Sequence, residues 1–234
     1  MPLIDSALSF IAPHHCLGCQ DEGQICCQKC LKSLQINPQD LVCYNCQISK
    51  DVHYGICLAC QRKQSLNGVF WYANYKNKIT KDLIKALKFN NVHASSKVMA
   101  TSLKECIPGE VILKTKFISA VPTANKRVRQ RGWDQAKLIS VSLAKFLKIP
   151  NKTLLIRASS FDQIGASKAD RVKSSEKFFK PTRLSLIRDN TIIIVDDLVT
   201  TGATLNSAAK TLKSAGAKEV YAVAFARQPL KRSN

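Results

Sequence analysis

Residues 192–205, IIIVDDLVTTGATL, set the fold that we predict for this chain. The stretch begins with four β-branched residues, a composition typical of a buried central strand. Two consecutive carboxylates come next, and a Thr-Thr-Gly-Ala-Thr turn then opens a helix over residues 203–215. Strand, turn and helix in this order form the unit from which a parallel sheet with flanking helices is built.

The rest of the C-terminal part repeats this alternation. Apolar and β-branched runs predict strands over residues 69–75, 117–121, 192–195 and 220–226. Apolar residues at helical spacing predict helices over residues 79–89, 95–107, 134–147 and 203–215. We therefore predict an α/β fold over residues 66–234, with a mostly parallel sheet flanked by helices on both faces.

The turn after the central strand has the chemistry of a sugar-phosphate site. A helix N-terminus exposes backbone N–H groups that favour an anion, threonine hydroxyls add donors, and a glycine lets a phosphate approach the backbone. Asp196 and Asp197 would repel a phosphate but accept hydrogen bonds from sugar hydroxyls, so a ligand such as ribose 5-phosphate satisfies both demands. The alternative is a turn in which an aspartate only caps the helix. We predict Asp196 and Asp197 as catalytic residues, and as ligand-binding residues Val199, Thr200, Thr201, Gly202, Ala203 and Thr204.

Cysteines predict a metal-binding module at the N-terminus. Nine of the ten cysteines precede residue 61, and eight of them form four Cys-x-x-Cys pairs. Two such pairs complete a tetrahedral Cys₄ zinc site, so we predict two structural zinc ions. Sequential pairing is the simpler arrangement, with cross-bracing, an iron–sulfur cluster and Cys26 in place of Cys27 as alternatives. The predicted ligands are Cys16, Cys19, Cys27 and Cys30 for one ion and Cys43, Cys46, Cys57 and Cys60 for the other.

Charge divides the chain at the same place as the cysteines do. The net charge is +20, yet residues 1–68 hold five basic and five acidic residues, so the entire excess lies in the remainder. Two composition shifts at one place predict a zinc ribbon over residues 1–65 and a second domain over residues 66–234. Within the latter, residues 124–188 carry 16 basic and four acidic residues, a charge that favours nucleic-acid phosphates. A generic basic surface is the alternative.

The chain resembles a known family along nearly its whole length. Residues 192–205 resemble the phosphoribosyl-pyrophosphate (PRPP) motif of type I phosphoribosyltransferases. The four cysteine pairs together with this motif resemble the ComF (ComFC, amidophosphoribosyltransferase-like) competence proteins. Further matching stretches are IKALKF at 84–89, VPTANKRVRQRGWDQA at 121–136, Gln163, Arg171 and Phe178, and residues 215–227.

This resemblance implies a ligand and a biological role. The ligand would be PRPP, bound with magnesium, and the arginines that match the family's would contact its pyrophosphate. By resemblance these residues are Arg127 and Arg131, joined by Lys88. The resemblance also implies a role in natural transformation, the handling of incoming single-stranded DNA, with a DNA-import helicase or another competence protein as partner. The alternative function is an active phosphoribosyltransferase of nucleotide metabolism or salvage without a direct DNA role.

Nothing in the sequence predicts membrane insertion. No run of about 18 apolar residues is present, and the first 13 residues lack the basic start and long apolar stretch of a secretory signal. We therefore expect a cytoplasmic protein, in which cysteines serve more often as metal ligands than as disulfides.

Overall fold

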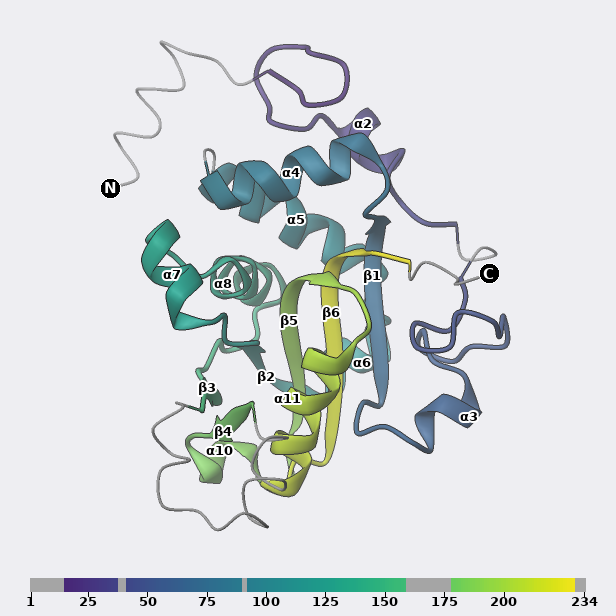
Figure 1. Ribbon diagram of the computed structural model, residues 1–234, viewed down its shortest axis with the longest axis vertical. Coiled ribbons are helices and arrows are strands. Elements are labelled where there is room, and N and C mark those ends of the chain that lie inside the picture. Colours follow the sequence, from purple (N-terminus) through teal and green to yellow (C-terminus); the bar gives the residue numbers. More distant parts are fainter. Residues whose placement is uncertain (1–14, 38–40, 90–91, 159–177, 230–234) are drawn as a thin grey trace.

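The computed structural model describes residues 15–37, 41–89, 92–158 and 178–229 (Figure 1). Its centre is a four-stranded sheet in the order β1-β6-β5-β2, in which every neighbouring pair runs parallel. The strands are β1 (Gly68–Asn74), β2 (Thr115–Ala120), β5 (Thr191–Val199) and β6 (Glu219–Arg227). The predicted mostly parallel sheet is confirmed.

Strand β5 is buried on both faces because helices cover both sides of the sheet. Ile193 and Val195 belong to one hydrophobic cluster, and Ile192 and Ile194 belong to the other. All four side chains are 0% exposed. An uninterrupted β-branched run is what a central parallel strand requires, which is why this strand could be recognised in the sequence.

Helices form a layer on each side of the sheet. One layer holds α4 (Lys78–Phe89), α5 (Val92–Cys106) and α8 (Gln135–Leu147), whose apolar residues join the cluster that contains Ile193. The other side is covered by α11 (Ala203–Ser214), which lies across β5 and β6 in Figure 1. The short helix α6 (Gly109–Lys114) leads into β2. Among the described helices, none combines the length and the apolar composition needed to cross a lipid bilayer.

Two local predictions were wrong. Strand β5 does not end at the two carboxylates but continues to Val199, because β6 supplies parallel backbone partners as far as Arg227. The basic segment after Pro122, which is not among the predicted helices, contains the helix α7 (Asn125–Arg131). This helix ends at Gly132, whose φ of 83° is the left-handed conformation that a glycine cap provides.

A small antiparallel hairpin lies beside the main sheet and was not predicted. Its strands are β3 (Leu155–Arg157) and β4 (Phe179–Pro181), and the one-turn helix α10 (Leu184–Ile187) follows. Strands of three residues are too short to show an alternating pattern, which is why the sequence did not reveal them. Gln163 and Arg171, which contribute to the family resemblance, lie outside the described residues.

The cysteine-rich part, with α2 (Gln28–Lys32) and α3 (Leu58–Gln61), packs along the free edge of β1. The backbone N–H of Ile36 donates to Tyr72 O at 3.0 Å, and the N–H of Val69 donates to Tyr54 O at 2.7 Å. The predicted division between residues 65 and 66 falls just before β1. Side chains from both parts nevertheless share the two hydrophobic clusters, so two separate domains remain a prediction.

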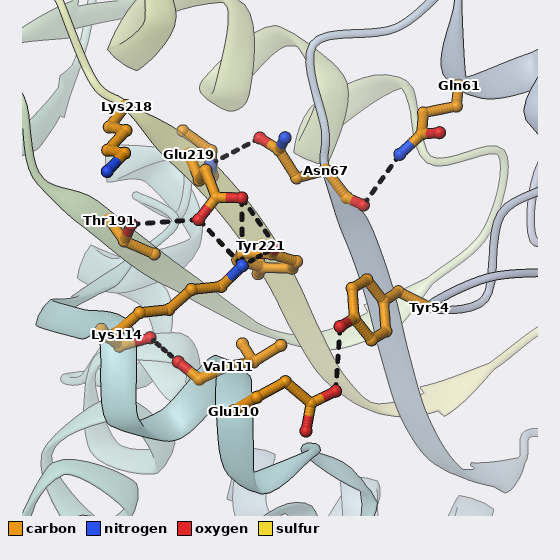
Figure 2. A network of polar contacts seen from close by, with 12 residues as sticks. Tyr54, Gln61, Asn67, Glu110, Val111, Lys114, Thr191, Lys218, Glu219 and Tyr221 are labelled. Carbon is orange, nitrogen blue, oxygen red and sulfur yellow. Dashed lines mark hydrogen bonds and ion pairs between the residues drawn. The ribbon is translucent and has the colours of Figure 1, made fainter.

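A network of polar side chains lies at the edge of the sheet where β5 and β6 begin (Figure 2). Lys114 Nζ lies 2.9 Å from Glu219 Oε2 and donates to Tyr221 Oη at 2.7 Å. Tyr54 Oη donates to Glu110 Oε1 at 2.9 Å, which ties the cysteine-rich part to α6. These side chains bond to one another at the amino edge of the sheet. The predicted ligand-binding residues lie at the opposite, carboxyl edge.

Candidate functional site

A cavity of about 450 Å³ opens at the carboxyl edge of the sheet, where β2 and β5 end. This is the edge at which open α/β sheets place their ligands. The cavity joins segments from several parts of the chain. Its lining residues are Lys88, Val121, Pro122, Thr123, Ala124, Arg131, Gln135, Arg157, Asp196, Asp197, Leu198, Thr200 and Thr204.

The two carboxylates differ in their electrostatic environment. Burial, and then the neighbouring charge of Asp197, raise the pKa of Asp196 well above its ordinary value. Asp196 Oδ1 also accepts a hydrogen bond from the backbone N–H of Asp197 at 2.8 Å. Asp197 Oδ2 lies 3.6 Å from Lys88 Nζ, an ion pair in which both side chains are mostly buried. One carboxyl group is thus disposed to hold a proton while the other faces a cation.

The turn after β5 supplies hydroxyl groups on one side and a buried glycine on the other. Thr200 and Thr204 line the cavity, whereas Thr201 does not, and Thr201 Oγ1 accepts a hydrogen bond from the Ala203 N–H at 3.3 Å. Gly202 is buried, has a φ of 77°, and stands at the N-terminus of α11. Of the six residues predicted to bind the ligand here, Thr200 and Thr204 line the cavity, and Val199, Thr201, Gly202 and Ala203 are absent from its lining.

Basic side chains reach the cavity from two helices. Lys88 comes from the last turn of α4 and Arg131 from the last turn of α7. The Arg131 guanidinium lies 5.9 Å from the ring centroid of Phe89, a contact that orients it. Arg127, the other predicted pyrophosphate contact, belongs to α7, and its side chain lies outside the described part of the structure.

Gln135 and Arg157 line the cavity although sequence reasoning did not single them out. The Gln135 side chain is only 3% exposed, and its Nε2 has no hydrogen-bond partner among the residues that the structure describes. Because a buried amide without a partner is costly, this group is available to a ligand. Arg157 Nη1 donates to Pro122 O at 3.3 Å, which holds the guanidinium at the rim. Gln135 lies in a stretch quoted for the family resemblance, whereas Arg157 had no signal in the sequence.

Asp134 fixes the wall between β2 and α8. Its Oδ1 caps α8 by accepting from the Lys137 N–H at 3.3 Å. The same carboxylate accepts from Thr123 Oγ1 at 2.9 Å and from the Thr123 N–H at 3.1 Å. Trp133 Nε1 donates to Leu87 O at 3.0 Å, so the end of α4 and the start of α8 are joined next to Lys88.

The eight predicted metal ligands form two clusters in sequential pairing. Within each cluster all four sulfur atoms lie within 4.8 Å of one another, and they are Cys16, Cys19, Cys27 and Cys30 in the first and Cys43, Cys46, Cys57 and Cys60 in the second. The Cys19–Cys27 and Cys46–Cys57 sulfurs are 3.7 and 3.9 Å apart. A tetrahedron with zinc–sulfur bonds of about 2.3 Å has edges of about 3.8 Å, so both clusters are compatible with structural zinc.

The remaining cysteines have other surroundings. All ten cysteines are free thiols. Cys26 is 2% exposed and belongs to the hydrophobic cluster under α5, which removes it as an alternative to Cys27. Burial raises the pKa of Cys106 to about 12, in keeping with a core thiol.

Comparisons with known proteins give sequence matches over most of the chain. Residues 136–234 match the model of the phosphoribosyl transferase domain. Competence protein ComFC of Bacillus subtilis (strain 168) is 27% identical over 205 residues, which cover 77% of this chain and 81% of that protein. Competence protein F of Haemophilus influenzae is 25% identical over 227 residues, which cover 91% of this chain and 96% of that protein.

A more distant similarity exists to a solved structure. The glutamine PRPP amidotransferase of B. subtilis, complexed with ADP and GMP, has a TM-score of 0.42 and 18% identity over 56% of this chain and 26% of that one, too low to carry an argument. The sequence matches are therefore the informative ones. Over most of its length the chain is similar to the competence proteins ComFC and F, and residues 136–234 match the phosphoribosyl transferase domain model.

Proposed function

We propose that the cavity at the carboxyl edge binds PRPP or a related ribose 5-phosphate ligand. The observation that carries this proposal is the position of unlike groups around one cavity of about 450 Å³. The hydroxyl-bearing Thr200 and Thr204, the carboxylates Asp196 and Asp197, and the cations Lys88 and Arg131 all line it. A ligand with a 5-phosphate, a diol and a pyrophosphate has a group to match each of these three kinds of side chain.

Each group has a role in this proposal. The 5-phosphate would accept hydrogen bonds from Thr200, Thr204 and the N–H groups that open α11. Asp196 and Asp197 would accept hydrogen bonds from the ribose hydroxyls. The pyrophosphate would be neutralised by Arg131 and Lys88, and by Arg127 if its side chain reaches the cavity.

Magnesium fits this site as a partner of the ligand. The chemistry that it supplies when bound with PRPP is neutralisation of the pyrophosphate charge. Asp197 is already paired with Lys88 at 3.6 Å, so the Lys88 ammonium group and a magnesium ion would both lie near this carboxylate. Binding of PRPP should therefore be tighter with magnesium than without it.

The proposal is tested by titrating PRPP into the protein with calorimetry. The double variant Asp196→Asn, Asp197→Asn removes the acceptors for the ribose hydroxyls and should lose PRPP binding. Asp82→Asn is the control. Asp82 forms an ion pair with Lys78 on α4, so this substitution removes one carboxylate charge that does not line the cavity. Unchanged PRPP affinity in the double variant would show that the ribose assignment is wrong.

We further propose a role in natural transformation, because the homologues are named competence proteins. The excess of basic residues over 124–188 would serve single-stranded DNA, and the neutral cysteine-rich part would serve protein partners such as a DNA-import helicase. The alternative is an active phosphoribosyltransferase of nucleotide metabolism. Such a reaction needs no covalent nucleophile, since an amine or base attacks the anomeric carbon as pyrophosphate leaves.

A PRPP-turnover assay against a panel of bases and amines separates these functions. Release of pyrophosphate that depends on one acceptor would establish a transferase. Binding of PRPP without turnover, together with binding of single-stranded DNA, would support a binding protein of the transformation pathway. We also propose that the two cysteine clusters hold zinc, so metal analysis should find two zinc ions per chain.

A further inference from the structure

The second cysteine cluster touches the turn that we propose to bind the 5-phosphate. Tyr44, the residue after Cys43 in the first knuckle of this cluster, is 0% exposed. Its ring lies against the backbone of Gly202. A Cβ atom built on Gly202 would stand 2.4 Å from Tyr44 Cε2, so only a glycine leaves room for the ring. The two residues are 158 positions apart in the chain, and no local pattern predicts their contact.

Hydrogen bonds connect the same knuckle to both ends of the turn. At the end of β6, the Arg227 guanidinium donates to Cys43 O at 3.1 Å and to Tyr44 O at 2.9 Å. The next residue, Gln228, donates its N–H to Val199 O at 2.8 Å, where β5 leads into the turn.

On the other side of the turn, the link runs through the first turns of α11. The backbone N–H of Ser65 donates to Asn206 Oδ1 at 2.8 Å. Tyr44 Oη in turn donates to Gln64 Oε1, the side chain next to Ser65. The knuckle is therefore connected to the strand that enters the turn, the glycine within it and the helix that leaves it.

The first cysteine cluster has a different neighbour. A Cβ atom built on Gly18 would stand 2.9 Å from Ile79 Cδ1, at the beginning of α4. Leu17, which occupies the position that Tyr44 has in the second cluster, packs against the hydrophobic cluster under α5. The first cluster thus rests on the start of α4, while Lys88 lies at the far end of that helix.

We propose that Tyr44 is a positioning residue for the turn 200–204, and that metal in the second cysteine cluster and ligand in the cavity therefore stabilise each other. This inference rests on the proposed binding of PRPP. Metal fixes the backbone of the knuckle and so holds the Tyr44 ring against Gly202. Since linkage is reciprocal, a ligand that orders the turn must strengthen metal binding in the second cluster by the same factor.

The reciprocal effect is measurable on the intact protein. Zinc-loaded protein is treated with a chelator and a cysteine alkylating reagent, with and without saturating PRPP and magnesium, and tryptic peptides are followed by mass spectrometry. Cleavage after Lys32, Lys50 and Arg62 separates Cys43 and Cys46, and also Cys57 and Cys60, from the cysteines of the first cluster. We expect PRPP to slow alkylation in the second cluster about fivefold or more and to leave the first cluster unchanged.

Variants test the residue itself. Tyr44→Ala should weaken PRPP affinity about fivefold or more, whereas Tyr44→Phe, which keeps the ring, should bind as the wild type does. Leu17→Ala is the matched control in the first cluster and should leave PRPP affinity unchanged. Should Tyr44→Ala fail to fold, the alkylation experiment on wild-type protein still decides the matter.

The outcomes separate this inference from the function on which it rests. If wild-type protein does not bind PRPP, the proposed function is overturned and the link with it. If PRPP binds but protects neither cluster, or protects both to the same extent, the link alone is overturned. Equal PRPP affinity of folded Tyr44→Ala and wild type would likewise remove Tyr44 as a positioning residue.

Discussion

Gly202 is a single residue at which conformation and packing make separate demands. Its φ of 77° is unfavourable for any residue with a side chain, and the Tyr44 ring occupies the place of a Cβ atom. Gly132 shares the first demand, with a φ of 83°, but has nothing within 4 Å of a built Cβ atom. Substitutions at the two glycines therefore separate the cost of backbone strain from the cost of a clash with the Tyr44 ring.

We predict that Gly202→Ala lowers the free energy of unfolding by more than Gly132→Ala does. The left-handed conformation alone costs an alanine about 1–2 kcal/mol, and Gly132→Ala should lose no more than this. Gly202→Ala must also displace the Tyr44 ring. Urea denaturation of both variants gives the comparison, and equal losses would mean that the ring moves aside freely.

Asp196 should make stability depend on pH. Because its pKa is raised in the folded state, folding is favoured by the proton that it holds. That contribution is complete below the unfolded pKa of about 3.9 and is lost as the pH rises through the raised folded value. Asp196→Asn removes this loss, so we predict a higher free energy of unfolding than wild type at pH 7, with the gain shrinking toward pH 4.

Denaturant titrations at several pH values check this prediction, with Asp82→Asn, a partly exposed carboxylate outside the cavity, as the control. A variant that is less stable than wild type by the same amount at every pH would contradict it. If Asp196→Asn is more stable than wild type but no longer binds PRPP, Asp196 serves function at a cost in stability.

At the scale of an element, α8 presents an exposed face with like charges. Lys137, Lys145 and, just beyond its end, Lys148 are exposed. The opposite face is buried against the sheet through Ile139 and Leu143. The helix is thus held in place by its apolar side, and its charged side is open to a polyanion.

Neutralising this face should weaken binding of single-stranded DNA and flatten its salt dependence. Removing one phosphate contact reduces the slope of log K against log salt by about 0.7, so Lys137, Lys145 and Lys148 changed to Gln should reduce it by up to about 2. Fluorescence anisotropy with a labelled oligonucleotide measures the slope. The control changes three exposed lysines of the neutral N-terminal part, Lys29, Lys32 and Lys50. Equal effects of both triple variants would argue against a DNA face on α8.

At the scale of the whole molecule, the cysteine-rich part and the sheet share their hydrophobic clusters. Tyr72 Oη donates to Leu31 O at 3.1 Å, and the Trp71 ring lies 5.0 Å from the Arg227 guanidinium that holds the second cysteine knuckle. Loss of metal from the cysteines should therefore affect the entire chain, because opening the clusters exposes apolar surface on both parts.

We predict that a zinc chelator lowers the thermal unfolding midpoint of the full chain by roughly 5 °C or more, since 1 kcal/mol is worth about 2–4 °C for a chain of this size. Calorimetry measures the midpoint, and the same chelator saturated with zinc beforehand is the control. An unchanged midpoint would show that the cysteine clusters contribute nothing to folding. One zinc ion per chain by metal analysis would rule out two filled sites.

Features that depend on local pattern could be predicted from the amino-acid sequence. The β-branched run of β5 and the apolar spacing of α4, α8 and α11 indicated the fold class. Both signals depend only on residues that are close together in the sequence. The four Cys-x-x-Cys pairs indicated two four-thiol clusters, since a knuckle is a local structure. Asp196, Asp197 and the threonines after them pointed to the carboxyl edge for the same reason.

Features that depend on partners distant in sequence emerged only from the folded chain. β5 runs past its carboxylates because β6 extends beside it, and Gln135 and Arg157 reach the cavity because α8 and the β3–β4 hairpin are packed around it. The contact of Tyr44 with Gly202 joins residues from opposite ends of the chain. Such contacts arise from how whole elements pack, and a short stretch of sequence carries no information about the element that will lie against it.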